Sequence, residues 1–239
     1  MERIHRLQSS HLDNARTIWI REPGNASVAD IDRVLVFLDA EFYRERVGAV
    51  QILEALEAQA VIAPSLGVFI SHASIEARWV ECPCHAPFAR FIDEEFFPWL
   101  ERLYPRIGAF EQRVIAGLSY TGLAAAYVAM RAPARFTKVI AQSGSFWWND
   151  CWIVGEYRGM PNHLPADFYL DVGQEETHEN VRHKEDVLQV VSQLDGVRRF
   201  RDTLVEKGCT PKYVEFDGGH DFSAWSRTLP AALRWALAP

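Results

Sequence analysis

The stretch RVIAGLSYTGL, residues 113–123, constrains the fold of this chain more than any other. An apolar strand pattern ends in Gly-x-Ser, and a helical pattern begins immediately afterwards. A serine on such a sharp turn has its hydroxyl pushed out of the sheet, beside helix N–H groups that can stabilise an oxyanion. One position departs from the usual G-x-S-x-G form, because Thr121 stands where glycine is usual and Gly122 follows it. The stretch therefore predicts a nucleophile elbow at Ser119.

Strand and helix patterns alternate along the rest of the chain. Besides the elbow strand, we expect strands at residues 15–21, 33–40, 68–71, 138–145, 167–173 and 212–216. Helical spacing covers residues 47–60, 88–104, 123–130, 197–207 and 222–238. Residues 41–43 and 71–87 are expected to be loops, and residue 146 begins a long irregular section. This alternation predicts a parallel sheet with helices on both faces, in a single α/β domain over residues 1–239.

Composition narrows the class of protein. The chain has 239 residues, of which 49% are hydrophobic and 24% charged, as in globular proteins. Its net charge of −7 and the lack of any basic block argue against nucleic acid as a partner. Neither a signal peptide nor an apolar run of transmembrane length is recognisable, so we expect a soluble, cytoplasmic protein without a membrane partner. The sequence leaves open whether copies associate as a homo-oligomer.

Three chemically suitable side chains each follow the end of a predicted strand. They are Ser119, an acid at Glu175 or Glu176, and His220. In a parallel sheet, the active groups gather at the carboxyl ends of the strands. The order serine, acid, histidine is that of the α/β-hydrolases. We therefore predict a three-layer α/β-hydrolase fold with a catalytic triad at this edge of the sheet.

A serine hydroxyl needs a base within hydrogen-bond reach before it becomes a good nucleophile. His220 follows the last strand and the flexible pair Gly218-Gly219, which can deliver its ring over the sheet edge. The other histidines of loops and polar segments have no comparable reason to act as the base; these are His72, His85, His163, His178 and His183. The alternative interpretation of Ser119 is a helix N-cap without catalytic function.

The orienting acid and the oxyanion donors are predicted from their positions next to strand ends and next to the nucleophile. Glu176 is the favoured acid, Glu175 is its rival, and a solvated pair of loop charges is the alternative. Asp171 is expected to point into or across its strand, whereas Asp202 and Asp221 stay open as orienting acids. The oxyanion donors are expected to be the N–H of Tyr120, next to the nucleophile, and an N–H near Phe42.

The cysteines do not indicate a metal or a disulfide framework. The four cysteines are too few and too scattered for a disulfide-stabilised chain of this length. Cys82-Pro-Cys84-His85 is not a C-x-x-C pair, and no second pair completes four metal ligands. A buried structural thiol is the favoured interpretation of this motif, and neither a metal nor a cofactor is predicted.

With these residues placed, the chain resembles the putative-esterase branch of the α/β-hydrolases, and especially the catalytic domain of enterochelin esterases. The motifs that carry the resemblance are GLSYTGLAAAY from Gly117, PARF from Pro133, QSGSFWW from Gln142, RWVECPC from Arg78, EFFP from Glu95 and GGHD from Gly218. The resemblance implies an esterase with Ser119 as nucleophile and His220 as base. It also implies a substrate-side role for Arg78, for which an ion pair with Glu81 is the alternative.

We therefore expect a serine hydrolase that cleaves a small-molecule carboxylic ester through an acyl-enzyme. The alternatives are an acyltransferase that uses an alcohol acceptor and a non-catalytic binding protein in which Thr121 distorts the elbow. Aromatic richness and Arg78 indicate an aromatic or anionic acyl group.

Overall fold

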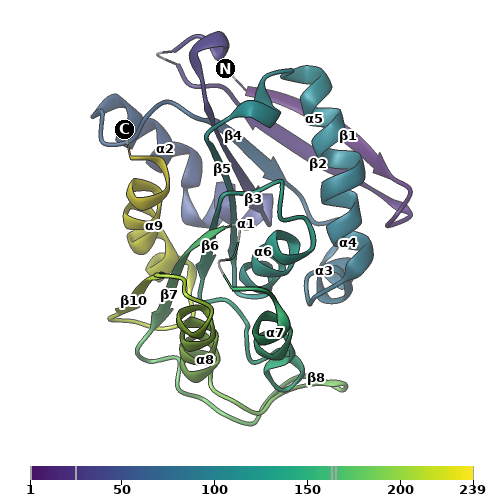
Figure 1. Ribbon diagram of the computed structural model, residues 1–239, viewed down its shortest axis with the longest axis vertical. Helices are drawn as coiled ribbons and strands as arrows, with labels where there is room; N and C mark the ends of the chain where they lie inside the picture. The colour runs from purple at the N-terminus through teal and green to yellow at the C-terminus, as the bar shows by residue number, and fades with distance from the viewer. Residues whose placement is uncertain (1, 25, 163, 165, 239) are drawn as a thin grey trace.

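An eight-stranded sheet forms the centre of the computed structural model, which describes residues 2–24, 26–162, 164 and 166–238. The strand order is β1-β2-β4-β3-β5-β6-β7-β10 (Figure 1). The first two strands run antiparallel to each other and β2 runs antiparallel to β4, whereas all later neighbours are parallel. The strands are β1 (Glu2–Ser9), β2 (Asn14–Arg21), β3 (Arg33–Leu38), β4 (Leu66–Ile70), β5 (Gln112–Leu118), β6 (Lys138–Gln142), β7 (Asp167–Gly173) and β10 (Lys212–Phe216).

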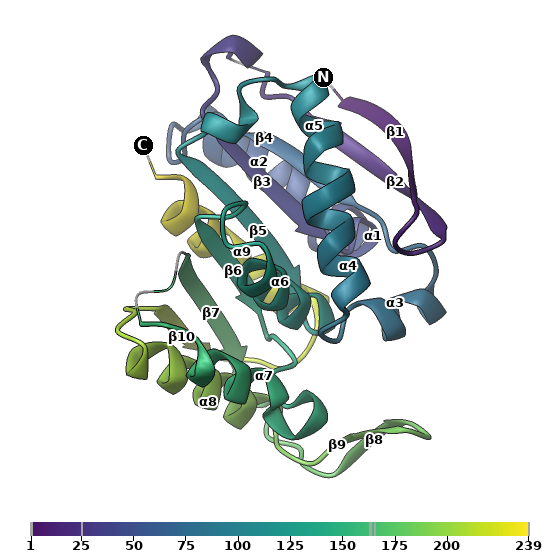
Figure 2. The same cartoon turned by 45° about the vertical axis from the view of Figure 1, so that its right-hand side comes forward.

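Helices cover both faces of this sheet, as Figure 2 shows. One face carries α4 (Ala86–Arg90), η3 (Phe91–Phe96), α5 (Phe97–Leu103), α6 (Tyr120–Arg131), α7 (Trp148–Gly159) and α8 (Gln193–Glu206). The opposite face carries α1 (Ala40–Phe42), η2 (Tyr43–Val47), α2 (Ala49–Ala58) and α9 (Phe222–Leu237). Each face has its own apolar core, because strands buried on both sides need helices over both. The predicted three-layer α/β-hydrolase arrangement is confirmed.

Several segments differ from the sequence-based expectations. The predicted loop at residues 41–43 is helical in α1 and η2, and the predicted loop at 71–87 contains α3 (Ile75–Glu81), which Ser74 caps. The section after residue 146 contains α7, whose first turn is left-handed at residues 149–151 and hides the helical pattern. Strand β1 and the hairpin of β8 (Val181–Lys184) and β9 (Val187–Gln189) were not predicted. Short 3₁₀ turns, η1 (Val28–Asp30) and η4 (Ile107–Ala109), complete the elements.

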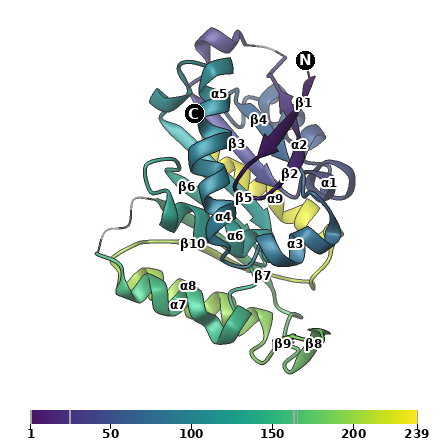
Figure 3. The same ribbon diagram turned by 90° about the vertical axis from the view of Figure 1, so that its right-hand side faces the viewer.

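The β8–β9 hairpin lies outside the main sheet. It is inserted between β7 and α8 and forms a separate two-stranded sheet. Figure 3 shows α7 and α8 side by side, with the hairpin beyond their ends. This position sets the hairpin near the carboxyl ends of the parallel strands, where the predicted site lies.

Candidate active site

Ser119 lies on the turn between β5 and α6, as the elbow motif predicts. Its φ of 53° and ψ of −121° are strained for a residue with a side chain. The turn is tight because glycines let the chains approach closely. A Cβ on Gly117 would meet the Thr121 carbonyl oxygen at 2.0 Å, and a Cβ on Gly122 would meet the Gly144 Cα at 2.9 Å. The close approach therefore falls on positions 117 and 122, and Thr121 is accommodated.

His220 connects the serine to the acid. Its Nε2 lies 2.9 Å from Ser119 Oγ, and its Nδ1 lies 2.5 Å from Glu176 Oε2. Its ring and that of Trp225 pack in a T-shaped arrangement, with ring centroids 4.9 Å apart and planes at 84°. The structure thus brings three residues from three strand ends into one hydrogen-bonded chain. This geometry suits a base that takes a proton from a hydroxyl and is oriented by a carboxylate.

The Glu176 carboxylate is fixed from its other side. Its Oε1 accepts hydrogen bonds from Ser143 Oγ at 2.6 Å and from the Gly173 N–H at 2.7 Å. Only 6% of Glu176 is exposed, so water competes little with these bonds. The Trp225 indole N–H donates to Ser143 Oγ at 3.1 Å and completes the support. The sequence analysis did not identify Ser143. This residue directly follows β6, has a φ of 44° and donates its hydroxyl proton to Glu176.

The other candidate acids have different positions. Glu175 is exposed, and Asp202 is paired with Arg201. Asp221 caps α9 by accepting from the Ser223 and Ala224 N–H groups. Asp171 is fully buried in β7 and accepts from the Ser143 N–H at 3.2 Å. Of these carboxylates, Glu176 is the one that contacts the His220 ring.

The two predicted oxyanion donors have different surroundings. Tyr120 is the first residue of α6, and N–H groups in a first helical turn have no intrahelical acceptor. Phe42 does not fit its predicted role, because its N–H donates to the Asp39 carbonyl at 2.9 Å. The expected loop is helical at this point, so the amide is already used. The Phe42 side chain instead packs against Phe222, with ring centroids 5.2 Å apart.

A cavity of about 300 Å³ opens beside Ser119. Aromatic side chains form much of its wall. Tyr120 contacts both Trp79, at 4.8 Å between ring centroids, and Trp147, at 5.8 Å. The residues that line the cavity are Arg78, Trp79, Ser119, Tyr120, Ser145, Trp147, Glu176, His178, His183, Gln189, Gln193 and His220. The cavity is therefore suited to a planar, partly apolar group held next to the serine.

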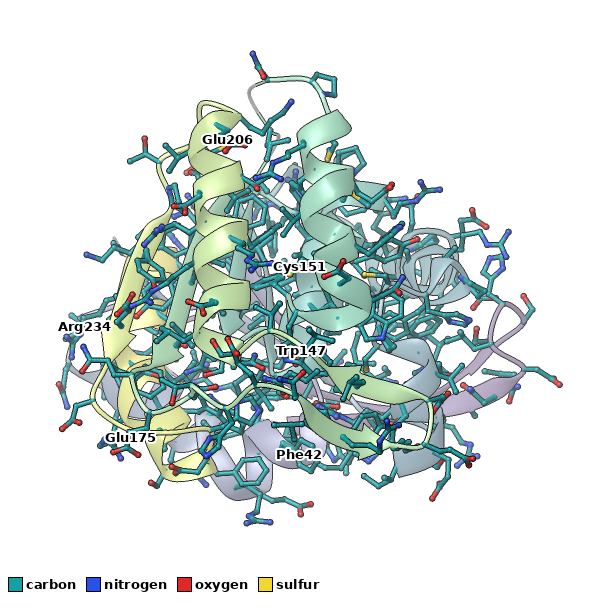
Figure 4. All side chains as sticks on the ribbon, turned by 90° about the horizontal axis from the view of Figure 1, so that it is seen from below. Phe42, Trp147, Cys151, Glu175, Glu206 and Arg234 are labelled. Carbon is teal, nitrogen blue, oxygen red and sulfur yellow. The ribbon has the colours of Figure 1, made fainter. Side chains whose placement is uncertain are left out.

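The β8–β9 hairpin supplies part of this wall. Its His183 stacks on Trp147 with ring centroids 5.1 Å apart, and its Nε2 donates a hydrogen bond to Gln189 Oε1, 2.9 Å away. Figure 4 looks onto this edge of the molecule and shows Trp147 next to the hairpin. The sequence analysis set His178 and His183 aside as loop residues, whereas both line the cavity. His163 lies outside the described residues. No sequence signal identified the hairpin, because its strands are short and polar.

Arg78 reaches the cavity from α3 but has a different ion-pair partner from the one expected. Its guanidinium binds Asp39, with Nε 2.8 Å and Nη2 2.7 Å from Oδ2. Glu81 pairs with Arg16 instead. Although burial opposes ionisation of Asp39, the Arg78 guanidinium holds the pKa of this carboxyl below its ordinary value. The Arg78 guanidinium carbon also lies 5.2 Å from the centre of the Phe42 ring.

In the described part of the chain, no group of three or more His, Cys, Asp or Glu side chains is arranged to hold a metal ion. Cys82 is buried, and burial raises the pKa of its thiol. Over the same residues, no helix has the length and apolar character needed to cross a membrane.

The chain is similar in sequence to curated esterases. The iron(III) enterobactin esterase of Dickeya dadantii is 29% identical over 96% of this chain and 53% of its own length. The ferri-bacillibactin esterase BesA of Bacillus subtilis is 29% identical over 68% of this chain and 55% of its own length. The chain thus spans about half the length of these curated relatives.

Solved structures show the same fold. The Shigella flexneri enterobactin esterase, crystallised in the presence of enterobactin, superposes with a TM-score of 0.82. It is 25% identical, and the match covers 99% of this chain and 58% of that one. A BES protein from Bacillus cereus matches in fold with a TM-score of 0.77, over all of this chain and 96% of its own. A family model described as putative esterase matches residues 9–236, and the chain therefore belongs to the putative esterase family of α/β-hydrolases.

Proposed function

We propose that this protein is a serine esterase that cleaves a carboxylic ester through an acyl-enzyme. The observation that carries the proposal is the hydrogen-bonded chain from Ser119 through His220 to Glu176 at the side of an open cavity. A strained serine, a base in contact with it and a buried acid behind the base are the parts that nucleophilic acyl transfer requires. Membership of an esterase family supports the same reaction.

The reaction proceeds in two halves. In the first, Ser119 Oγ attacks the ester carbonyl carbon while His220 Nε2 takes the hydroxyl proton, and the Tyr120 N–H stabilises the oxyanion. His220 then gives that proton to the leaving alkoxide, and the alcohol departs from the acyl-enzyme. In the second half, His220 deprotonates a water molecule, which attacks the acyl carbon. Collapse of the intermediate releases the acid and returns the proton to Ser119.

For the substrate, we propose an ester with an aromatic, anionic group close to the scissile bond. Tyr120, Trp79 and Trp147 provide aromatic surface, and Arg78 provides positive charge at the same cavity. Relatives named as enterobactin and bacillibactin esterases point in the same direction. An iron-chelating ester of this kind, which carries anionic aromatic rings, is thus the proposed substrate class.

The test compares wild-type protein with Ser119→Ala on a panel of 4-nitrophenyl esters that differ in the acyl group. We expect the variant to lose about 10³-fold or more of kcat, because the covalent route is closed. Circular dichroism and thermal unfolding should show that its fold persists. Turnover by the variant at the wild-type rate would exclude Ser119 as the nucleophile.

A further inference from the structure

Thr121 stands two residues after the nucleophile, where this kind of elbow usually has glycine, and it is 2% exposed. Its methyl group and hydroxyl therefore occupy space that a glycine leaves empty. Since the close contacts of the turn fall on Gly117 and Gly122, this space is available without distortion. The question is what the hydroxyl does there.

The hydroxyl contacts both backbone polar groups of Leu118, the residue that precedes Ser119. Thr121 Oγ1 accepts a hydrogen bond from the Leu118 N–H at 3.0 Å and lies 2.8 Å from the Leu118 carbonyl oxygen. Leu118 is the last residue of β5. The side chain thus fixes the backbone immediately before the nucleophile.

The same oxygen also reaches a charged group. Asp39 Oδ2 lies 3.1 Å from Thr121 Oγ1, so this carboxylate and the Leu118 carbonyl are the two acceptors within reach of the single hydroxyl proton. Asp39 follows β3 with a φ of 58°, is 3% exposed and binds the Arg78 guanidinium. Hydrogen bonds to a buried carboxylate are among the stronger ones in proteins.

We propose that Thr121 is a positioning residue that fixes the nucleophile turn relative to Arg78 through Asp39. The contacts form one path, from the backbone before Ser119 through the Thr121 hydroxyl and the Asp39 carboxylate to the guanidinium at the cavity. The threonine then has a role that glycine could not fill. Its side chain sets the distance between Ser119 Oγ and the Arg78 guanidinium, the charge that holds an anionic acyl group. The inference rests on the proposed esterase function. It adds how the charged group of the substrate is positioned relative to Ser119.

The experiment compares Thr121→Val, which keeps the shape without the hydroxyl, with Thr121→Ser, which keeps the hydroxyl. The substrates are 4-nitrophenyl benzoate and its 4-carboxy analogue, which share a leaving group and differ in charge. We expect Thr121→Val to lower kcat/KM about tenfold for the carboxylate ester and clearly less for the neutral ester, the size of one charged hydrogen bond. Thr121→Ser should restore the preference for the carboxylate ester to within about twofold of wild type.

A binding measurement separates this inference from the esterase proposal. Calorimetry with 4-carboxybenzamide and benzamide requires no turnover, and Thr121→Val should raise the Kd of the charged ligand selectively. A selective Kd change in a protein without esterase activity would refute the proposed function and support the role of Thr121. An unchanged preference in both assays for a Thr121→Val protein with wild-type melting behaviour would overturn the inference, as would equal losses in the serine and valine variants.

Discussion

At the scale of single residues, two members of the hydrogen-bonded chain could be predicted from the sequence. Ser119 and His220 are recognisable because glycines and strand ends surround them. The sequence does not decide whether Glu175 or Glu176 is the orienting acid, because tertiary packing determines which way adjacent loop residues point. Ser143 from β6 and Gly173 from β7 hold Glu176 inward, and no local pattern encodes that.

The role of Glu176 gives a residue-scale prediction. Glu176→Gln keeps the size of the side chain but removes the charge that stabilises the imidazolium, so kcat should fall about 10³- to 10⁴-fold. Glu175→Gln is the matched control, because Glu175 is exposed and adjacent. Steady-state kinetics of both variants on one 4-nitrophenyl ester decide the assignment. A larger loss in the Glu175 variant would place the orienting acid there.

At the scale of elements, the long apolar strands and amphipathic helices were predictable, and the short polar elements were not. A parallel strand buried on both faces leaves a continuous apolar run, as in β3 and β5. By contrast, β1 is largely exposed, and α3 has seven residues. The β8–β9 hairpin is mostly exposed too, so its placement depends on side-chain contacts with Trp147 and Trp79.

The hairpin carries the element-scale prediction. His183→Ala removes the ring that stacks on Trp147 and the hydrogen bond to Gln189, so one wall of the cavity loses its support. We expect KM for an aromatic ester to rise roughly three- to tenfold while kcat changes less than about twofold, as when binding contacts alone are lost. Glu185→Ala, between β8 and β9, is the control. A fall in kcat at constant KM would show that the hairpin serves the chemical step instead.

At the scale of the whole molecule, the sheet brings together groups that are far apart in the chain. Ser119 and His220 are separated by 101 positions, and parallel strand ends place them at one edge. The sequence order predicted this gathering. Asp171 was expected to point into or across its strand, and the fold buries this carboxyl group completely. The cost of that burial affects the stability of the entire fold.

Burial raises the pKa of Asp171 from 3.8 to about 7. Between these values the folded protein binds more protons at this site than the unfolded chain, so the site makes unfolding easier as pH rises. Asp171→Asn should remove this contribution and gain stability relative to wild type, by on the order of a few kcal/mol, between pH 5 and pH 8. Urea denaturation of both proteins at pH 5 and pH 8 measures the difference in their free energies of unfolding. Parallel pH dependences of the two unfolding free energies would contradict the buried-acid account.

The central claim is that Ser119 becomes acylated during ester cleavage. The most direct measurement is intact-protein mass spectrometry after rapid mixing with an activated aromatic ester and acid quenching, followed by peptide mapping. The account predicts a mass increase of one acyl group on Ser119 in wild-type protein and none in Ser119→Ala. Ester cleavage without an adduct on wild-type protein, or with the same adduct on the alanine variant, would contradict it.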